Sequence, residues 1–166
     1  MFLELIAVFV AGFAGAGIML MLSKGTGGRI PRWMIPAAAG VTMLAAAITN
    51  EYSWYSRTES ALPDGMEVAQ TVQQRAFWRP WTYVVPMTNR FVAVDTARLR
   101  PNTQSDQLWL ADLYFFGRWR PVTSVEVMVD CATGRRADPT LGDGSAPVWR
   151  DVGSDDPVVE TVCDKG

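Results

Sequence analysis

Residues 2–22 read FLELIAVFVAGFAGAGIMLML, and residues 33–50 read WMIPAAAGVTMLAAAITN. The first stretch holds a single charge, Glu4, and the second holds none. Because a helix rises about 1.5 Å per residue, the first stretch is long enough to cross a hydrocarbon core of about 30 Å, and the second is at the short end of the spanning range. The two stretches predict a transmembrane helical hairpin over residues 1–50, with helices at about 2–22 and 33–50.

The segment between the two stretches, residues 23–32, sets the expected topology. It is rich in glycine and carries three cations, Lys24, Arg29 and Arg32, with no acid. The positive-inside rule places such a loop in the cytoplasm, so both termini are expected on the outer side. A cleaved signal peptide is the alternative, but no cation precedes the first apolar run, and a basic start is typical of signal peptides. We therefore expect a retained helix.

The composition narrows the classes of function. The chain has 166 residues, no histidine, two cysteines and a formal net charge of −2. The absence of histidine excludes histidine acid–base catalysis and histidine metal sites, and two cysteines are too few for a four-cysteine metal site. The near balance of charge argues against a nucleic-acid binder, which shows a basic excess. We expect a protein that is not an enzyme and binds no cofactor.

Residues 51–166 form the expected exported part, with 12 Lys and Arg against 16 Asp and Glu. Both cysteines, Cys131 and Cys163, fall within it. Disulfides persist outside the cytoplasm, and two cysteines allow one intramolecular connectivity. We expect one structural disulfide. A reactive redox pair is the alternative, but such pairs are normally spaced as C-x-x-C.

Runs of β-branched and aromatic residues predict an antiparallel β domain of five or six strands over residues 77–166. The runs lie at residues 81–85, 91–94, 108–116 and 124–131, with a further short strand at 148–152. Residues 51–76 are expected to form a linker and a short helix, since apolar residues recur with helical spacing from Met66 to Ala76. For residues 158–163 the pattern leaves strand and helix open. The predicted fold class is membrane-anchored α+β, a two-helix hairpin followed by a small antiparallel β domain closed by one disulfide.

The order of features from Trp81 to Cys163 resembles the β domain of the surface-adhesin protein E family. A strand opened by Trp81 is followed by RFVAVD at residues 90–95, then by a long central strand and SVEVMVDC at residues 124–131. Two arginines follow, and the pattern closes with Trp149, a D-P turn at residues 156–157 and V-C at residues 162–163. The resemblance covers about half the chain. It implies a disulfide-closed antiparallel fold with Cys131 bonded to Cys163, and a core position for Trp81, and it transfers no function.

Small residues spaced four apart give the first candidate surface, in the membrane. Such spacing lets helix backbones approach closely in lipid. The residues concerned are Ala7, Ala11, Gly12, Gly15, Ala16 and, on the second helix, Gly40. Two helices hide only part of their surfaces, so a further membrane partner is one interpretation; packing of the two helices on each other alone is the other.

Tryptophan and arginine give the second candidate surface, in the exported domain. Trp78 and Arg79 lie in FWRPWTY at residues 77–83, and Arg118 and Trp119 lie in GRWRP at residues 117–121. Tryptophan, tyrosine and arginine are enriched in binding hot spots, and arginine gains energy over a tryptophan face. These four residues are a candidate docking surface; a strand start with membrane-proximal packing is the alternative.

The sequence therefore predicts a non-catalytic accessory or assembly subunit of a larger bacterial inner-membrane complex, respiratory or photosynthetic, with its C-terminal domain in the periplasm. The expected partners are membrane-protein subunits and the lipid bilayer, and self-association stays open. The alternative is a stand-alone, membrane-anchored periplasmic recognition module that binds a ligand or an envelope component.

Overall fold

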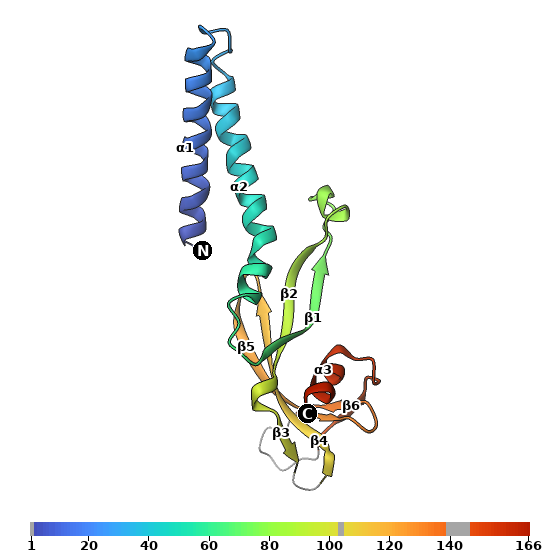
Figure 1. Cartoon of the computed structure of the whole chain (residues 1–166). Coiled ribbons are helices and arrows are strands. Elements are labelled where there is room, and N and C mark those ends of the chain that lie inside the picture. Colours follow the sequence, from blue (N-terminus) through green and yellow to red (C-terminus); the bar gives the residue numbers. More distant parts are fainter. Residues whose placement is uncertain (1, 103–104, 139–146) are drawn as a thin grey trace. The chain divides into compact units, whose positions relative to one another are not determined.

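A computed structural model describes residues 2–102, 105–138 and 147–166 (Figure 1). The chain divides into two compact units, residues 1–56 and residues 57–166. The first holds two helices, and the second holds a curled antiparallel sheet with a short helix. Each unit is described by itself.

Helix α1 (Phe2–Gly25) is apolar around its whole circumference, and only Gly12 and Gly15 are buried. Among the described helices it alone is long and apolar enough to cross a membrane by length and composition. A soluble core helix would bury most of its residues, whereas α1 exposes a series of large apolar side chains that includes Phe9 and Phe13.

Helix α2 (Met34–Glu59) begins close to the predicted position but runs nine residues further than residue 50. Its first part is the uncharged stretch, and its last part carries Glu51, Arg57 and Glu59. No glycine or proline interrupts residues 51–59, so nothing in the local sequence ends the helix where the apolar stretch ends. Because of this mixed composition, α2 does not meet the criterion of length and apolar composition for a membrane span, which α1 meets.

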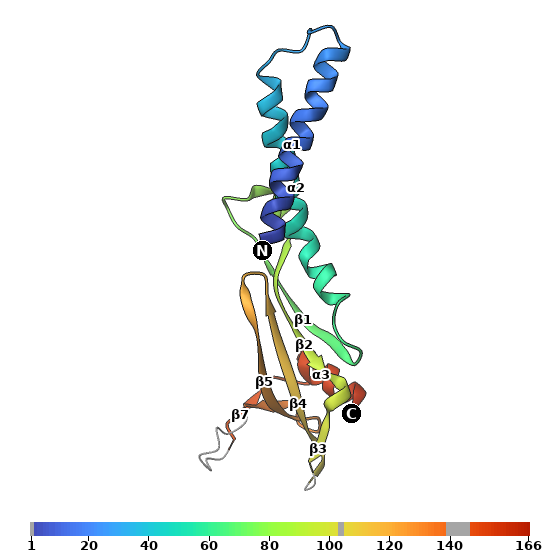
Figure 2. The ribbon, with the colours of Figure 1, turned by 90° about the vertical axis from the view of Figure 1, so that its left-hand side faces the viewer.

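Within the described residues the sheet has seven strands, against the five or six predicted, and all the pairings found there are antiparallel. The strands are β1 (Met66–Gln74), β2 (Met87–Asp95), β3 (Arg100–Asn102), β4 (Ser105–Gly117), β5 (Arg120–Asp130), β6 (Arg135–Ala137) and β7 (Trp149–Asp151). Their order in space is β1-β2-β4-β5-β6-β7, and β3 pairs with β4 along the same edge as β2. Figure 2 shows β1, β2, β4 and β5 side by side. The long strand β4 therefore has two neighbours on one edge, β2 along Leu113–Gly117 and β3 along the part nearer its start.

Two predictions for the start of this domain are wrong. The short helix expected within residues 51–76 is strand β1, and the domain begins before residue 77. The pairing of β1 with β2 is irregular between Val68 and Gln70 and again between Val72 and Gln73. At the first irregularity the extra residue is Ala69 of β1, which shifts the alternation of this strand, and at the second the extra residue is Asn89 of β2. The shift at Ala69 falls among the apolar positions whose spacing predicted a helix.

The strand expected at residues 81–85 is also absent. The chain there forms a short 3-10 helix, η1 (Pro80–Tyr83), with proline in its first turn. Trp81 is 44% exposed, which contradicts its expected core position, and the neighbouring Thr82 is buried instead. A second 3-10 turn, η2 (Thr96–Arg98), joins β2 to β3.

The C-terminal segment, for which strand and helix were both open, is helix α3 (Pro157–Lys165). Asp156 caps its start: the side-chain oxygen Oδ1 accepts hydrogen bonds from the backbone N–H groups of Val158 and Val159, at 3.0 and 3.2 Å. Proline in the first helical position fits an N-terminus, where no partner for its missing N–H is needed.

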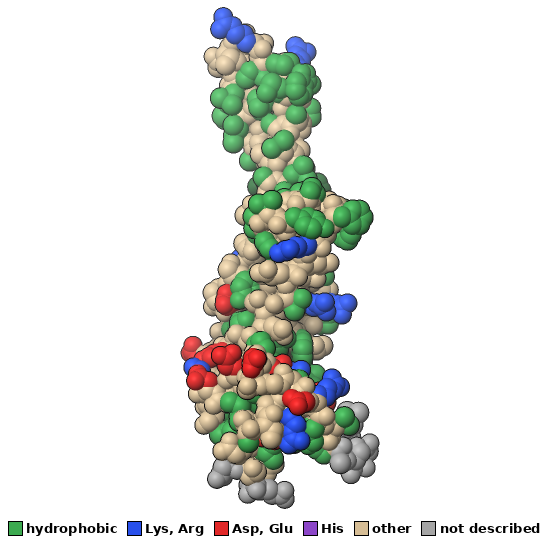
Figure 3. Space-filling model, turned by 90° about the vertical axis from the view of Figure 1, so that its right-hand side faces the viewer, with side chains coloured by type: hydrophobic (Ala, Val, Ile, Leu, Met, Phe, Trp, Pro, Cys, Tyr) green, Lys and Arg blue, Asp and Glu red, His purple; other side chains and the backbone are tan. Residues whose placement is uncertain are grey.

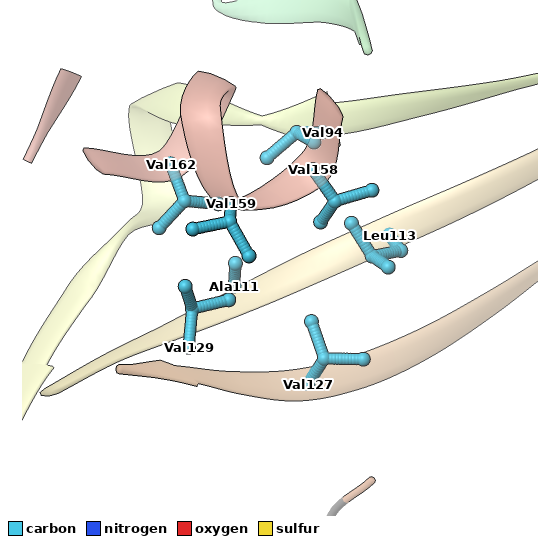
Figure 4. Close-up of a cluster of buried hydrophobic side chains, with 8 residues drawn as sticks. All are labelled: Val94, Ala111, Leu113, Val127, Val129, Val158, Val159 and Val162. Atoms are coloured by element: carbon cyan, nitrogen blue, oxygen red, sulfur yellow. The ribbon is translucent and has the colours of Figure 1, made fainter. Parts of the chain in front are cut away.

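Helix α3 closes the core by covering one face of the sheet (Figure 4). Three valines of α3, Val158, Val159 and Val162, are almost completely buried. They pack on side chains from β2, β4 and β5, namely Val94, Ala111, Leu113, Val127 and Val129. A nine-residue helix is marginal alone, so this packing is what holds it in place.

The disulfide between Cys131 and Cys163 is present and joins the end of β5 to α3, with the two Cα atoms 5.8 Å apart. The turn after Cys131 is ordered by Asp130, which is 8% exposed. Its carboxylate accepts hydrogen bonds from the Thr133 hydroxyl at 2.6 Å and from Arg135 at 3.1 Å. The hydroxyl of Thr133 is the main cause that lowers the pKa of Asp130 below its ordinary value, with Arg135 and two backbone N–H groups adding to it.

Candidate functional site

The small residues predicted on the helices differ in how far they are buried within the first unit. Gly12 and Gly15 are buried against α2: a methyl group on Gly12 would overlap the side chain of Met43, and one on Gly15 would overlap Thr42. Ala11 and Ala16 are half-buried, whereas Ala7 and Gly40 are exposed. Around Gly40, and around Gly17 on α1, an added side chain would meet open space.

The loop between the helices carries the three predicted cations on its exposed surface. Lys24 lies in the last turn of α1, and Arg29 and Arg32 lie between α1 and α2. Gly27 and Gly28 both adopt positive φ, 65° and 78°, which glycine accepts without strain. The turn that presents the cations therefore depends on this glycine pair.

The β domain has one end at which cations and aromatic rings gather. The loop between β1 and β2 and the turn between β4 and β5 both lie there, since the Arg118 N–H donates to the Asn89 carbonyl oxygen at 3.1 Å. No acid occurs at residues 68–94 or 113–125, whereas these stretches hold Arg75, Arg79, Arg90, Arg118 and Arg120. We call this the arginine end. Figure 3 shows acidic side chains gathered in one region of the face that it draws.

Three of the four residues of the predicted docking surface line one hollow at the arginine end. The hollow has a volume of about 210 Å³ and is lined by Trp78, Arg79 and Trp119 together with Met87 and Asn89. We call it the tryptophan hollow. Trp78 and Trp119 are 63% and 59% exposed. The fourth residue, Arg118, lies with its guanidinium 5.0 Å from the ring centre of Trp119.

Local hydrogen bonds fix the loop that carries Trp78. The buried Thr82 hydroxyl accepts from the Ala76 N–H at 3.0 Å and donates to the Arg79 carbonyl oxygen at 2.7 Å. The rings of Phe77 and Trp78 meet edge to face, 4.9 Å apart. The loop is thus held at its base while its aromatic side chains stay exposed, an arrangement that lowers the entropic cost of forming a contact.

A second hollow at the arginine end was not predicted. It measures about 330 Å³ and is lined by Phe115, Phe116, Gly117, Pro121 and Thr123, with Arg90 and Arg120 beside them; this is the arginine hollow. Its residues come from three strands, and only the strand register brings them together. In the sequence, Arg90 stands before Phe91 and Arg120 before Pro121, and neither pair predicts a hollow.

Among the described residues, no group of three or more His, Cys, Asp or Glu side chains is placed to hold a metal ion. No family model, no curated protein and no solved structure matches the chain. The resemblance to the surface-adhesin protein E family therefore stays a prediction.

Proposed function

We propose that the chain is a non-catalytic accessory or assembly subunit of a larger bacterial inner-membrane complex, of the respiratory or photosynthetic kind. Its helices hold it in the bilayer, and its β domain docks on the periplasmic side through the tryptophan hollow. The observation that carries this proposal is the convergence of Trp78, Arg79 and Trp119, from two separate hairpins, on one exposed hollow.

Membrane anchoring is supported by helix α1 and by its packing on α2. Helix α1 is long and apolar enough to span. Its close packing on Met43 and Thr42 at Gly12 and Gly15 favours a retained hairpin over a removable signal segment. The uncharged stretch of α2 serves as the second span, and the cations between the helices keep that loop in the cytoplasm.

Protein docking is supported by the residue types at the tryptophan hollow. Tryptophan and arginine dominate the energy of protein interfaces because their large surfaces lose water on contact. Phe77 and Val84, in the same loop between β1 and β2 as Trp78, are 81% and 83% exposed. Clustered exposed apolar side chains of this kind mark interaction sites on soluble domains.

The stand-alone recognition module is the second candidate, and one observation favours it. Gly12 and Gly15 already pack closely on α2 within the hairpin, so these two small residues are not available for contact with a third helix. A third helix would have to use the other side of the hairpin, where Gly17 and Gly40 face open space.

Purification of the tagged chain from native membranes in mild detergent, with mass spectrometry of the co-purifying chains, tests the proposal. A stoichiometric set of membrane subunits is expected. The double variant Trp78→Ala/Trp119→Ala is expected to lose them, and Val148→Ala, which trims another exposed apolar side chain, is the matched control. Recovery of the wild-type chain alone would contradict the accessory role and favour the recognition module.

A variant in α1 distinguishes contacts that a partner makes with the helices from contacts that it makes with the β domain. Gly17→Leu adds bulk where the hairpin has space, so it is expected to disturb a partner helix only. Gly15→Leu overlaps Thr42 and is expected to open the hairpin itself. Unchanged co-purification with Gly17→Leu, beside loss with the tryptophan variant, would assign docking to the β domain.

A further inference from the structure

The face of the sheet that carries the core continues past the end of α3. Alternate residues of a strand share a face, so Phe115 lies on the same face of β4 as Ala111 and Leu113. On β5, Val125 follows Val127 in the same way. Ala111, Leu113 and Val127 are buried, but Phe115 and Val125 are 40% and 41% exposed. The apolar face is therefore longer than the helix that covers it.

Two arginines border this uncovered part of the face. Arg90 pairs with Gly117, and Gly117 pairs with Arg120, so the three residues stand side by side on adjacent strands. A Cβ atom added to Gly117 would lie 3.4 Å from the Cβ of Arg120 and 3.6 Å from the Cγ of Arg90. The two side chains thus flank the glycine on the core-bearing face.

The two arginines differ from most others in the domain. Within residues 2–102, 105–138 and 147–166, neither Arg90 nor Arg120 forms an ion pair, and both are exposed. Five other arginines of the domain each pair with an acid: Arg98, Arg100, Arg135, Arg136 and Arg150. No acid occurs at residues 68–94 or 113–125, the stretches of sequence that contain Arg90 and Arg120.

We propose that the arginine hollow binds an anionic amphiphile, a molecule with an acyl chain and a carboxylate or phosphate head. The acyl chain lies on Phe115, Pro121 and the neighbouring apolar face, and the head binds between Arg90 and Arg120. Guanidinium groups form strong, often bidentate hydrogen bonds with carboxylate and phosphate. The volume of about 330 Å³ is within the range of small-molecule sites.

This inference rests on the proposed membrane anchor, because a bilayer beside the domain supplies such molecules. Two sources share the chemistry: an anionic phospholipid of the bilayer and a free fatty acid. Helix docking is a poorer fit, since a second apolar helix would leave the charge of Arg90 and Arg120 without a partner.

Photo-cross-linking in native membranes tests the inference on the full chain. A benzophenone amino acid replaces Phe115, and the adducts formed on illumination are identified by mass. We expect acyl lipids with an anionic head; the adduct mass separates a phospholipid from a fatty acid. Arg90→Ala/Arg120→Ala is expected to lower the adduct yield about tenfold. Arg90→Lys/Arg120→Lys retains the charge and is expected to restore part of the yield.

The matched control is Arg98→Ala/Arg150→Ala, which removes two exposed arginines elsewhere and is expected to leave the yield unchanged. Adducts to polypeptide only, adducts to neutral lipids, or a yield that does not depend on Arg90 and Arg120 would each overturn the inference. The same probe at Phe13 of α1 reports on the anchor. Lipid adducts at Phe13 without any at residue 115 would overturn only the inference, whereas none at Phe13 would overturn the proposed membrane anchor.

Discussion

Replacing Cys131 and Cys163 with alanine removes the covalent link between the end of β5 and α3. The two cysteines are 32 residues apart in sequence. In the chain-entropy account, a closed loop of this length lowers the free energy of the folded state relative to the unfolded state by about 3.7 kcal/mol. That is a large share of the total stability of a small domain, about 5–15 kcal/mol.

The loss is expected to be largest at α3. Without the disulfide, this nine-residue helix is held by Val158, Val159 and Val162, and each buried valine contributes about 1.5–3 kcal/mol. The helix still docks in the variant, but it opens more often. Its amides are expected to exchange with solvent faster by about two to three orders of magnitude, since about 1.4 kcal/mol corresponds to a tenfold change.

Hydrogen-exchange mass spectrometry of the full chain in lipid nanodiscs, across a urea series, measures both effects. Reduced wild-type chain provides an independent route to the same state and is expected to match the double variant. A loss of stability below about 1 kcal/mol, or unchanged protection of residues 157–165, would refute the reasoning. Faster exchange in the α1 amides would also count against it, because the disulfide lies wholly in the other unit.

Three further predictions concern the same domain and use urea unfolding of the full chain as the measurement. Asp156→Ala removes the N-cap of α3 and is expected to cost about 1 kcal/mol, whereas Asp155→Ala beside it is expected to cost under about 0.5 kcal/mol; equal effects would contradict the capping role. Gly134→Ala places a methyl group 2.7 Å from the backbone of Gly153 at a φ of +63° and is expected to cost more than about 2 kcal/mol, while Gly153→Ala meets only strain in φ and is expected to cost about 1 kcal/mol. The folded-state pKa of Asp130 lies below its ordinary value of 3.8, so its carboxylate contributes stability that is present above pH 3.8 and lost as pH falls through the folded pKa. In Asp130→Asn the free energy of unfolding is expected to fall less as the pH is lowered through this range. The same pH dependence in the variant and the wild type would contradict this role of Asp130.

Patterns within single segments predicted much of the β domain. Alternation along residues 124–131 and the apolar run at residues 108–116 indicated the two long strands that form the centre of the sheet. The two cysteines and the turn residues indicated the disulfide and the hairpins. The sequence of β1 predicts a helix because the extra residue Ala69 disrupts the period of two along this strand, and only the pairing with β2 reveals that irregularity.

The candidate sites required knowledge of contacts across strands. Trp78 and Trp119 were singled out by residue type, but the sequence contained no sign that two hairpins bring them to one hollow. No pattern in the sequence marks Arg90 and Arg120, because only the strand register places both of them beside Gly117. The helix at residues 157–165 was foreseeable in principle, since aspartate followed by proline is typical of a helix start.

The pairing of β4 with β5 has a consequence for the order in which the domain folds. The two strands are joined by the two residues Arg118 and Trp119, and their ladder runs from Gly117 and Arg120 out to Leu108 and Asp130. Contacts that are close in sequence form early, because little loop entropy is lost in making them. Strand β2 reaches this hairpin over a longer connection, and α3 needs the finished surface of β2, β4 and β5. The turn between β4 and β5 is therefore expected to form first, and the rest of the arginine end follows when β2 joins the hairpin. The cysteines are expected to come within bonding distance only when α3 docks, at the final step of assembly.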